Sequence, residues 1–558
     1  MRPLLITSIL LAAAAFSREA KITILATTDL HGNLYPWDYL SGREMPRGLA
    51  KIASLIAAER RTAPSALLLD AGDTIQGASI ESVWQTYVST GKLPLNMKFS
   101  ATPPPTSDPM AAAMNHLRYD AMTLGNHEFN FGLKNLNKAR DDAKFPWLSA
   151  NTKAHGARAF PPSILKTVNG VRIAIIGLTT PGIPQWEKPE NYTGYSFTDP
   201  IAAARAQVAE LRPKADLVVI LAHGGIERPG TNENFLNALV AQVSGIDAVI
   251  YGHTHAEVSE KLQNGVLLTQ PKNWGMSLAR LDFTLESAPD GKSFRVASKS
   301  SRTIPVTAAT PADPEILRLA EPYHEVTERW LKSVVAQSPS ELRAGRSRIE
   351  DTAIIDAIHQ VQLHYAKADV SFAAAFNFAA RIPKGPVTIR DVASLYVYDN
   401  ELYAIEGNGR MVREALENAA RYFRTCPDST CKGSLTSRDF LGFNYDMAQG
   451  VTYQIDLTKP EGSRIQNLQY QGAPLKDDQK LRIALNNYRA GGSGGYEMFT
   501  KAPVLWRSYE DIRDLIIRYY ADHALPQSAD NNWRIEPEAA RKNLIDEAAS
   551  FTNRAPTQ

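Results

Sequence analysis

The N-terminal half of the chain alternates short apolar runs with polar turns. The runs read ITILATTDLHG, ALLLDAGDT, DAMTLGNHE, VRIAIIGLTT, DLVVILAHGG and IDAVIYGHTH. Each run has the length of a β-strand and is almost uniformly apolar, as expected for a strand that is covered on both faces. Helix-like segments, such as residues 49–61, lie between the runs. The pattern predicts an α/β layered domain over residues 21–310.

The pattern changes at residues 307–314, which read TAATPADP and have the composition of a loop. Beyond them, apolar residues recur every three or four positions, which predicts a connecting helix within residues 311–340. These residues are Ile316, Leu319, Tyr323, Val326, Trp330 and Val334. Residues 341–558 then combine helical stretches at 354–367 and 410–423 with the strand-like runs VTYQIDL and LRIALNNY. We expect a second domain of the α+β class there.

The composition is that of a globular protein with local rather than global binding sites. The chain has 558 residues, which is too long for one ordinary core, and 44% of them are hydrophobic and 22% charged. A formal charge of +2 provides no broad field that would attract nucleic-acid polymers or membranes. Binding partners must therefore be inferred from particular sites.

The first 20 residues have the organisation of a secretory signal peptide. Arg2 precedes the apolar run PLLITSILLAAAAF, which is too short to span a bilayer comfortably and ends among small residues. A buried first strand or helix is the alternative, but the abrupt polar sequence SREA favours export. No later run of about 18 apolar residues follows, so we expect no stable membrane insertion after cleavage and a periplasmic or secreted location.

The chain has only two cysteines, Cys426 and Cys431. In an exported protein this spacing favours a short-loop disulfide. A metal or catalytic pair is the weaker alternative, because neither cysteine has a nearby histidine or a second CxxC motif.

Polar residues cluster where the predicted strands end. Five of the 11 histidines lie at such ends beside glycines, although any single one would more readily be a hydrogen-bonded structural residue. Imidazole, carboxylate and amide ligands suit Zn, Mn, Fe or Co, whereas the lack of thiolates argues against a structural zinc site. Seven ligands are more than one tetrahedral ion needs, and they suit two divalent ions about 3.5–4 Å apart. Such a pair of ions activates water and stabilises both the entering and the leaving oxygen of a phosphoryl displacement. The candidates are Asp29, His31, Asp73, Asn126, His223, His253 and His255.

The segments DLHG, GD within DAGDT, GNHE, AHGG and GHTH resemble, in order and context, those of the calcineurin-like metallophosphoesterases. The whole chain resembles the exported 5′-nucleotidase superfamily. This resemblance implies a four-layer α/β/β/α metallophosphoesterase domain, a connecting helix, and a C-terminal domain that supplies the nucleotide pocket. It also implies that Asp73 bridges two ions, one held with Asp29, His31 and His255, and the other held with Asn126, His223 and His253.

The same resemblance gives His127 a role beside the phosphate rather than on the metals. An imidazolium there would stabilise transition-state charge and protonate the leaving oxygen. The family often pairs this histidine with an aspartate three residues later, but Asn130 stands there in this chain. An amide can orient the imidazole but cannot raise its pKa as a carboxylate would.

The second half resembles the branch that hydrolyses 2′,3′-cyclic nucleotides and then 3′-nucleotides. The resemblance lies in LYVYDNELYAIEGNGR, GFNYDMAQGVTYQIDLTKPEGSRIQNL, LNNYRAGGSGGYEMF and SADNNWRI, and Asn130 fits the same branch. By family analogy Tyr445 and Tyr496 would stack on the base. Such stacking tolerates any base, because every base has a π-face. Asn487 could bind base or sugar, or cap a turn. Arg381 is either a phosphate contact or an exposed arginine.

These expectations describe an exported two-metal phosphoesterase with a small nucleotide as its partner, no nucleic-acid polymer, and a monomeric state. The nearest rival is a 5′-nucleotidase or nucleotide-sugar hydrolase of the same architecture. A rival from another class is a catalytically silent nucleotide-binding protein. That rival predicts lost ligands, whereas all seven are present.

Overall fold

The structure is a computed structural model that describes residues 18–96, 103–226, 233–288, 293–398, 400–426, 428, 430–437 and 439–552. The chain divides into two compact units. Unit 1 comprises Met1–Asp38 and Arg43–Thr327, and unit 2 comprises Tyr39–Gly42 and Glu328–Gln558. Residues 1–17 of the predicted signal peptide lie outside the described residues, and Glu19 begins the first strand.

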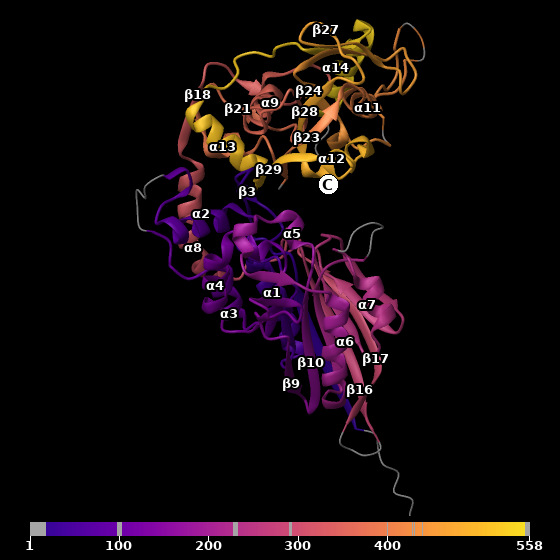
Figure 1. Cartoon of the computed structure of the whole chain (residues 1–558). Helices are drawn as coiled ribbons and strands as arrows, with labels where there is room; N and C mark the ends of the chain where they lie inside the picture. Colours follow the sequence, from indigo (N-terminus) through magenta and orange to yellow (C-terminus); the bar gives the residue numbers. More distant parts are fainter. Residues whose placement is uncertain are drawn as a thin grey trace, which may run out of the picture. The chain divides into compact units, whose positions relative to one another are not determined.

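Unit 1 is built on two six-stranded sheets (Figure 1). The first has the order β17 (Phe294–Pro305), β16 (Ser277–Ser287), β1 (Glu19–Thr27), β4 (Leu67–Asp70), β5 (Ala121–Thr123) and β6 (Trp147–Leu148). The second has the order β14 (Val258–Gln263), β15 (Val266–Gln270), β13 (Ala248–Tyr251), β12 (Leu217–His223), β10 (Val171–Thr179) and β9 (Ser163–Val168). Short strands complete the unit: β2 (Trp37–Asp38), β3 (Arg43–Glu44), β7 (Thr152–Ala154), β8 (Ala157–Arg158) and β11 (Tyr195–Phe197).

The central strands of both sheets are parallel. In the first sheet β1, β4, β5 and β6 run in one direction, and in the second β10, β12, β13 and β15 do so. The outer strands β16, β17, β9 and β14 are antiparallel to their neighbours. All residues of β4, β12 and β13 are buried, as their uniformly apolar sequences predict.

Two apolar layers hold these sheets in place. Inward-facing residues of both sheets, including Ile24, Leu69, Ile175, Val219 and Leu281, form one core between them. The opposite face of the second sheet packs on α6 (Pro200–Leu211) and α7 (Leu236–Gln242), which Figure 1 shows outside that sheet. Helix α1 (Leu49–Thr62), the predicted helix at 49–61, packs on β16 of the first sheet. The four-layer α/β/β/α prediction is confirmed.

The remaining helices of unit 1 are α2 (Ser79–Thr90), α3 (Pro109–Leu117), α4 (Gly132–Asp142) and α5 (Ile183–Trp186). The connecting helix is α8 (Pro314–Leu331), and the division between the units falls within it. The helix ends before Val334, which instead begins strand β18 (Val334–Ser338). The paired β-branched residues Val334 and Val335 favour a strand at this point.

Unit 2 combines two larger sheets with helices, as the α+β prediction requires. One sheet has the order β24 (Asp446–Gln449), β20 (Val370–Ala374), β28 (Lys480–Asn486), β23 (Glu401–Asn408) and β29 (Val504–Asp511). The other has the order β27 (Ala473–Pro474), β26 (Ile465–Tyr470), β25 (Val451–Asp456) and β30 (Trp533–Glu536). The helices of unit 2 are α9 (Ala353–Ala366), α10 (Ile389–Ala393), α11 (Gly409–Ala420), α12 (Asn487–Ala490), α13 (Ile512–Asp522) and α14 (Glu538–Thr552). Two short pairs join β18 to β22 (Gly385–Thr388) and β19 (Leu342–Arg343) to β21 (Arg381–Ile382).

Two further expectations bear on covalent links and membranes. Cys426 and Cys431 form a disulfide, so the prediction from their spacing is confirmed. Among the described residues, no helix combines the length and the apolar character that crossing a bilayer requires.

Candidate active site

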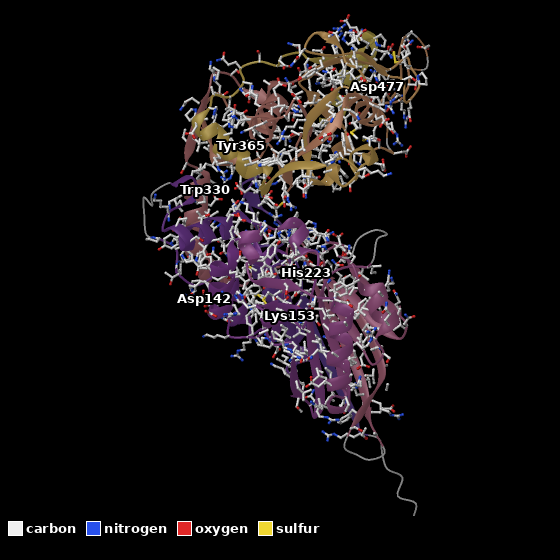
Figure 2. All side chains as sticks on the ribbon, viewed as in Figure 1. Asp142, Lys153, His223, Trp330, Tyr365 and Asp477 are labelled. Carbon is white, nitrogen blue, oxygen red and sulfur yellow. A yellow bond between two sulfur atoms is a disulfide. The ribbon has the colours of Figure 1, made fainter. Side chains whose placement is uncertain are left out.

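The carboxyl ends of the parallel strands in unit 1 bring the predicted metal ligands together. Asp29 follows β1, Asp73 follows β4 and Asn126 follows β5 in the first sheet. In the second sheet His223 is the last residue of β12, and His253 follows β13. Figure 2 labels His223 among the side chains of unit 1. Because both sheets present the same ends of their strands, these side chains converge although they come from distant parts of the sequence.

The first ligand group consists of Asp29, His31 and His255, whose ligand atoms lie within 4.8 Å of one another. The Nε2 atoms of His31 and His255 are 2.9 Å apart, and Nε2 of His255 is 3.5 Å from Oδ1 of Asp29. Nδ1 of His31 donates to the carbonyl of Gln76 at 2.9 Å. This bond leaves the lone pair of Nε2 directed at the other two ligands, as metal-binding histidines require.

The second group consists of Asp73, His223 and His253. Nδ1 of His223 donates to the carbonyl of Ala71 at 2.8 Å, while its Nε2 lies 2.9 Å from Oδ2 of Asp73. Oδ1 of Asn126 is buried and has no hydrogen-bond partner among the described residues, and the equally buried Nε2 of His223 faces the Asp73 carboxylate. A buried polar atom without a partner is costly, and a cation shared by these two atoms would satisfy the Asn126 oxygen. The donor set therefore fits a divalent ion.

Asp73 lies between the two groups. Its Oδ2 is 2.9 Å from Nε2 of His223 and 3.9 Å from Nε2 of His31. Its Oδ1 accepts a hydrogen bond from the backbone N–H of His127 at 2.8 Å. This placement is the one that a carboxylate shared by two ions needs.

Burial sets the protonation of the imidazoles. It lowers the pKa of His31 to about 4, against the opposing charge of Asp73, and it lowers the pKa of His253 to about 3. Both rings are therefore neutral at pH 7, which is the form that binds metals. Burial also lowers the pKa of His223, but the adjacent Asp73 carboxylate outweighs it and raises that pKa to about 10. The Asp73–His223 pair thus holds one proton at pH 7, and a cation bound by both residues would replace that proton.

The backbone around the ligands is strained. Five of the seven candidates have a positive φ, a conformation that costs a non-glycine residue about 1–3 kcal/mol and concentrates at functional sites. These residues are Asp29 (φ 48°), His31 (46°), Asp73 (58°), His253 (80°) and His255 (53°). Two glycines permit the close approach of these turns. A methyl group on Gly125 would collide with Oδ1 of Asp73, and one on Gly252 would collide with Thr28.

Glu128, for which the sequence suggested no role, organises the turns that carry the second group. Its fully buried carboxylate accepts three backbone N–H bonds, from Asp73 at 3.0 Å, Thr74 at 2.6 Å and Gly125 at 2.6 Å. The bonds tie the loop after β4 to the loop after β5. The carboxylate within GNHEFNFG was the available signal, but two of its three partners, Asp73 and Thr74, are distant in sequence.

His127 and Asn130 are brought together by the short 3₁₀ turn His127–Phe129. Nδ1 of His127 lies 2.6 Å from Oδ1 of Asn130. An amide oxygen only accepts hydrogen bonds, so Nδ1 carries the proton. Asn130 therefore occupies the position from which an orienting partner can fix the ring.

The structure contradicts the predicted base-stacking role of Tyr445 and Tyr496. Both side chains are fully buried, so neither ring offers a face to a base from solvent. Tyr445 packs on Tyr422 with ring centroids 5.3 Å apart, and Tyr496 packs on Phe499 at 6.0 Å. The irregular backbone of these loops turns the two rings into the core.

Other aromatic residues on the same two loops do face solvent. Tyr488 is 42% exposed, and Phe443, in the turn Gly442–Asn444, is partly exposed. Arg489, only 1% exposed, connects the loops by donating to the Phe443 carbonyl at 2.6 Å and to both carboxylate oxygens of Asp446 at 2.8 and 2.9 Å. This buried ion pair fixes the backbone next to both exposed rings.

The other predicted substrate contacts divide into free and engaged groups. Asn487 is partly buried, and its Oδ1 has no hydrogen-bond partner among the described residues, so it can bind a ligand. The neighbouring Asn486 caps α12 by accepting from the N–H of Arg489 at 2.9 Å. The exposed Arg381 lies 3.4 Å from Glu341 in an ion pair.

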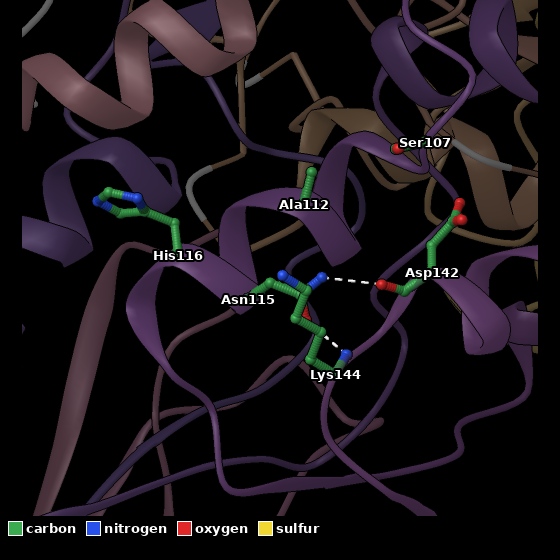
Figure 3. A pocket seen from close by; sticks show the side chains of 6 residues that line it. All are labelled: Ser107, Ala112, Asn115, His116, Asp142 and Lys144. Atoms are coloured by element: carbon green, nitrogen blue, oxygen red, sulfur yellow. Dashed lines mark hydrogen bonds between the residues drawn. The ribbon is translucent and has the colours of Figure 1, made fainter.

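A surface cavity of about 400 Å³ in unit 1 contains none of these residues. Figure 3 shows its lining, with Asn115 of α3 between Asp142 and Lys144. Asn115 donates to the Asp142 carbonyl at 2.8 Å and accepts from the Lys144 N–H at 2.6 Å. The cavity therefore lies apart from the predicted metal ligands at the strand ends.

Comparison with known families agrees with this geometry. A family model described as calcineurin-like phosphoesterase matches residues 22–257. A second model, described as the C-terminal domain of 5′-nucleotidase, matches residues 334–501. The chain thus combines a region that matches calcineurin-like phosphoesterases with a region that matches the C-terminal domain of 5′-nucleotidase. The region that the first model matches contains all seven candidate metal ligands. The region that the second model matches contains Phe443 and Tyr488.

The chain resembles nucleotide phosphoesterases over nearly its whole length. It is 30% identical over 96% of its length to the trifunctional nucleotide phosphoesterase protein YfkN of Bacillus subtilis, and it spans 40% of that protein. It is 28% identical to a 2′,3′-cyclic-nucleotide 2′-phosphodiesterase/3′-nucleotidase of Salmonella typhimurium, covering 95% of the chain and 91% of the relative. The crystal structure of a putative 5′-nucleotidase from Staphylococcus aureus matches with a TM-score of 0.71, 28% identity, and coverage of 93% of this chain and 100% of that one.

Proposed function

We propose that the protein is an exported two-metal phosphoesterase. It hydrolyses 2′,3′-cyclic ribonucleotides to 3′-nucleotides and then converts these to nucleoside and phosphate. The observation that carries this proposal is the pair of ligand groups on either side of Asp73, beside which the buried Oδ1 of Asn126 has no hydrogen-bond partner among the described residues. The Salmonella relative, which matches over most of both chains, is named for these two activities.

The residues of unit 1 divide the chemistry between them. One divalent ion would be held by Asp29, His31 and His255. The other would be held by His223, His253 and Asn126. Asp73 would contribute to both sites. The ions, when bound, would supply the positive charge that polarises the phosphoryl group. Zn, Mn, Fe and Co all suit this donor set.

His127 would act on the leaving oxygen. A water oxygen forms a bond to phosphorus and releases a proton to solvent, while the bond from phosphorus to the ribose oxygen breaks and leaves its electron pair on that oxygen. The ribose oxygen then takes the proton from Nε2 of His127, because Nδ1 is engaged with Asn130. The 2′ oxygen leaves in the first reaction and the 3′ oxygen in the second.

Unit 2 would recognise the nucleoside. Phe443 and Tyr488 take the stacking role that the sequence had assigned to their buried neighbours, and Asn487 offers to base or sugar an oxygen that has no partner among the described residues. Stacking on aromatic rings accepts any base, so we propose broad base acceptance.

Steady-state kinetics on 2′,3′-cyclic AMP, 3′-AMP and 5′-AMP, with added Mn²⁺ or Zn²⁺, test the substrate. We expect kcat/KM to be far higher for the first two compounds than for 5′-AMP. Rapid turnover of 5′-AMP without cyclic activity would replace the proposal with a 5′-nucleotidase. Fewer than one metal per chain after reconstitution, without activity on any of the three, would indicate a silent nucleotide-binding protein.

Export is tested separately by N-terminal sequencing of the mature protein. Cleavage within or just after residues 1–20 is the expected result. A retained Met1 in the mature chain would contradict export without affecting the catalytic proposal. The monomeric state also stays a prediction, which the molar mass measured by light scattering tests.

A further inference from the structure

A hydrogen-bonded chain extends from His127 to a buried carboxylate that the mechanism has not yet used. Nδ1 of His127 lies 2.6 Å from Oδ1 of Asn130, and Nδ2 of Asn130 donates to Oε2 of Glu187 at 2.8 Å. Glu187 follows α5 and is 57 residues from Asn130 in the sequence. We propose that Glu187 is a positioning residue for the leaving-group proton, because it holds the Asn130 amide in the one orientation that keeps His127 protonated at Nδ1.

The orientation follows from what each group can donate. An ionised carboxylate only accepts hydrogen bonds, so Glu187 selects the NH₂ group of Asn130 and turns the amide oxygen toward His127. That oxygen can only accept, so the facing nitrogen of His127 must carry a proton. If the amide flipped, its NH₂ group would face Nδ1 and would favour an unprotonated nitrogen there. The imidazolium, which needs protons on both nitrogens, would then lose its partner.

Glu187 is itself held firmly. It is only 4% exposed, and its Oε1 accepts bonds from the backbone N–H of Lys188 at 2.7 Å and from Nδ2 of Asn191 at 2.8 Å. The same Asn191 group also donates to the backbone carbonyl of Asn130 at 2.9 Å. Each carboxylate oxygen thus has donors on protein groups whose positions are fixed by the short turn at residues 187–191 and the loop after β5.

The bond to Glu187 settles what the Asn130 side chain cannot settle alone, because an amide can present either its oxygen or its NH₂ group to His127. Glu187 accepts from the NH₂ group at 2.8 Å and leaves the oxygen facing Nδ1 of His127. Burial raises the pKa of the Glu187 carboxyl above its ordinary value, and the bonds from Asn191 and from the Lys188 N–H oppose that rise. The geometry alone, through the donor and acceptor pattern, is what fixes the amide.

The inference rests on the proposed role of His127, so its test depends on the leaving group. The leaving ribose oxygen of 3′-AMP needs a proton, whereas the phenolate of p-nitrophenyl phosphate leaves without one. In Glu187→Gln, the new amide oxygen retains the bonds from Lys188 and Asn191, and its NH₂ group confronts the NH₂ group of Asn130. We expect kcat for 3′-AMP to fall by about 10- to 100-fold, which is at or below the lower end of the effect of general-acid catalysis because His127 itself remains, while kcat for p-nitrophenyl phosphate changes less than about threefold.

A carboxylate–amide exchange provides the decisive variant. When Asn130→Asp is combined with Glu187→Gln, the new carboxylate at position 130 would accept from His127 and from the new NH₂ group at position 187. Every bond of the chain is then restored, so we expect this double variant to recover most of the activity that Glu187→Gln loses. Asn130→Asp alone places two carboxylates in contact and should stay impaired, so the two changes should be strongly non-additive.

Controls separate positioning from folding. Glu190→Gln changes an exposed carboxylate in the same turn and should leave kcat for both substrates unchanged. Metal per chain, measured by elemental analysis, and the thermal unfolding midpoint should match wild type in Glu187→Gln and in the double variant. Equal losses of kcat on 3′-AMP and p-nitrophenyl phosphate, or a double variant no better than Glu187→Gln, would overturn the inference.

The two proposals fail in distinguishable ways. If wild type hydrolyses p-nitrophenyl phosphate but neither the cyclic nucleotide nor 3′-AMP, the proposed function fails, and the Glu187 test moves to whichever alkyl phosphate ester the protein cleaves. If wild type is active on 3′-AMP and Glu187→Gln is indistinguishable from it on every substrate, the inference about Glu187 fails while the proposed function stands.

Discussion

The carboxylate of Glu128 gives a sharp test of how the metal centre is assembled. It is fully buried and accepts backbone N–H bonds from Asp73, Thr74 and Gly125. Glu128→Gln keeps the size of the side chain but replaces one acceptor oxygen with an NH₂ donor. In the best orientation, the amide oxygen keeps the bonds from Asp73 and Gly125, and the NH₂ group then faces the N–H of Thr74.

The magnitude follows from that count of bonds. A hydrogen bond to a charged group contributes about 1.5–3 kcal/mol, and the variant loses one such bond while the two others become neutral. Removing a buried charge offsets part of the loss, because burial and the nearby Asp73 carboxylate both raise the pKa of Glu128. We therefore expect Glu128→Gln to lower the free energy of unfolding of unit 1 by about 2–3 kcal/mol.

Asp70→Asn is the matched control, since Asp70 is equally buried at the start of the same loop. Its carboxylate accepts from the N–H of Gly72 and from the hydroxyls of Thr27 and Thr74. Hydroxyls can reorient to accept from an amide, and burial already raises the pKa of Asp70 to about 7. We expect this variant to lose about 1 kcal/mol or less.

Urea unfolding with and without Mn²⁺ provides the assay. A ligand stabilises the unit that binds it, so the transition that Mn²⁺ shifts belongs to unit 1. The two variants are then compared by the free energy of that transition. Equal stability of Glu128→Gln and wild type, or equal losses in Glu128→Gln and Asp70→Asn, would refute the assigned role of Glu128.

Other predictions concern single side chains of each unit. Asp73→Ala should lose both ions, as elemental analysis would show, and one retained ion with full occupancy would argue against a bridging carboxylate. Phe443→Ala and Tyr488→Ala should each raise KM for 3′-AMP by about 5- to 150-fold, the equivalent of 1–3 kcal/mol of stacking, and an unchanged KM would remove that ring from base recognition. Tyr445→Phe should leave both KM and thermal stability near wild type, because the buried Tyr445 hydroxyl has no hydrogen-bond partner among the described residues.

The fold of unit 1 was largely readable from sequence because its signals are local. Buried parallel strands are short apolar runs, and their carboxyl ends must meet at one edge of a sheet. The positions of Asp29, Asp73 and His223 follow from these two facts alone. The ligands at the strand ends of the second sheet, His223, His253 and His255, join those of the first sheet because the two sheets pack face to face. The sequence implied this packing only through the family resemblance.

The remaining parts of the site depend on contacts that no local pattern encodes. Tyr445 and Phe443 are two residues apart in one loop, and only the irregular backbone decides that the first ring is buried and the second exposed. Glu187 has no motif of its own, and its partner Asn130 is 57 residues away. Strand periodicity predicts direction in a sheet, but it gives no information about side-chain direction in turns.

Real-time ³¹P NMR of 2′,3′-cyclic AMP, in the presence of the metal-loaded protein, tests the proposed reaction most directly. The cyclic phosphate signal should fall while 3′-AMP rises as an intermediate, and the 3′-AMP signal should then fall as inorganic phosphate appears. Accumulation of 2′-AMP, or a cyclic phosphate signal that persists while 5′-AMP is hydrolysed under the same conditions, would contradict the two-step reaction at this metal centre.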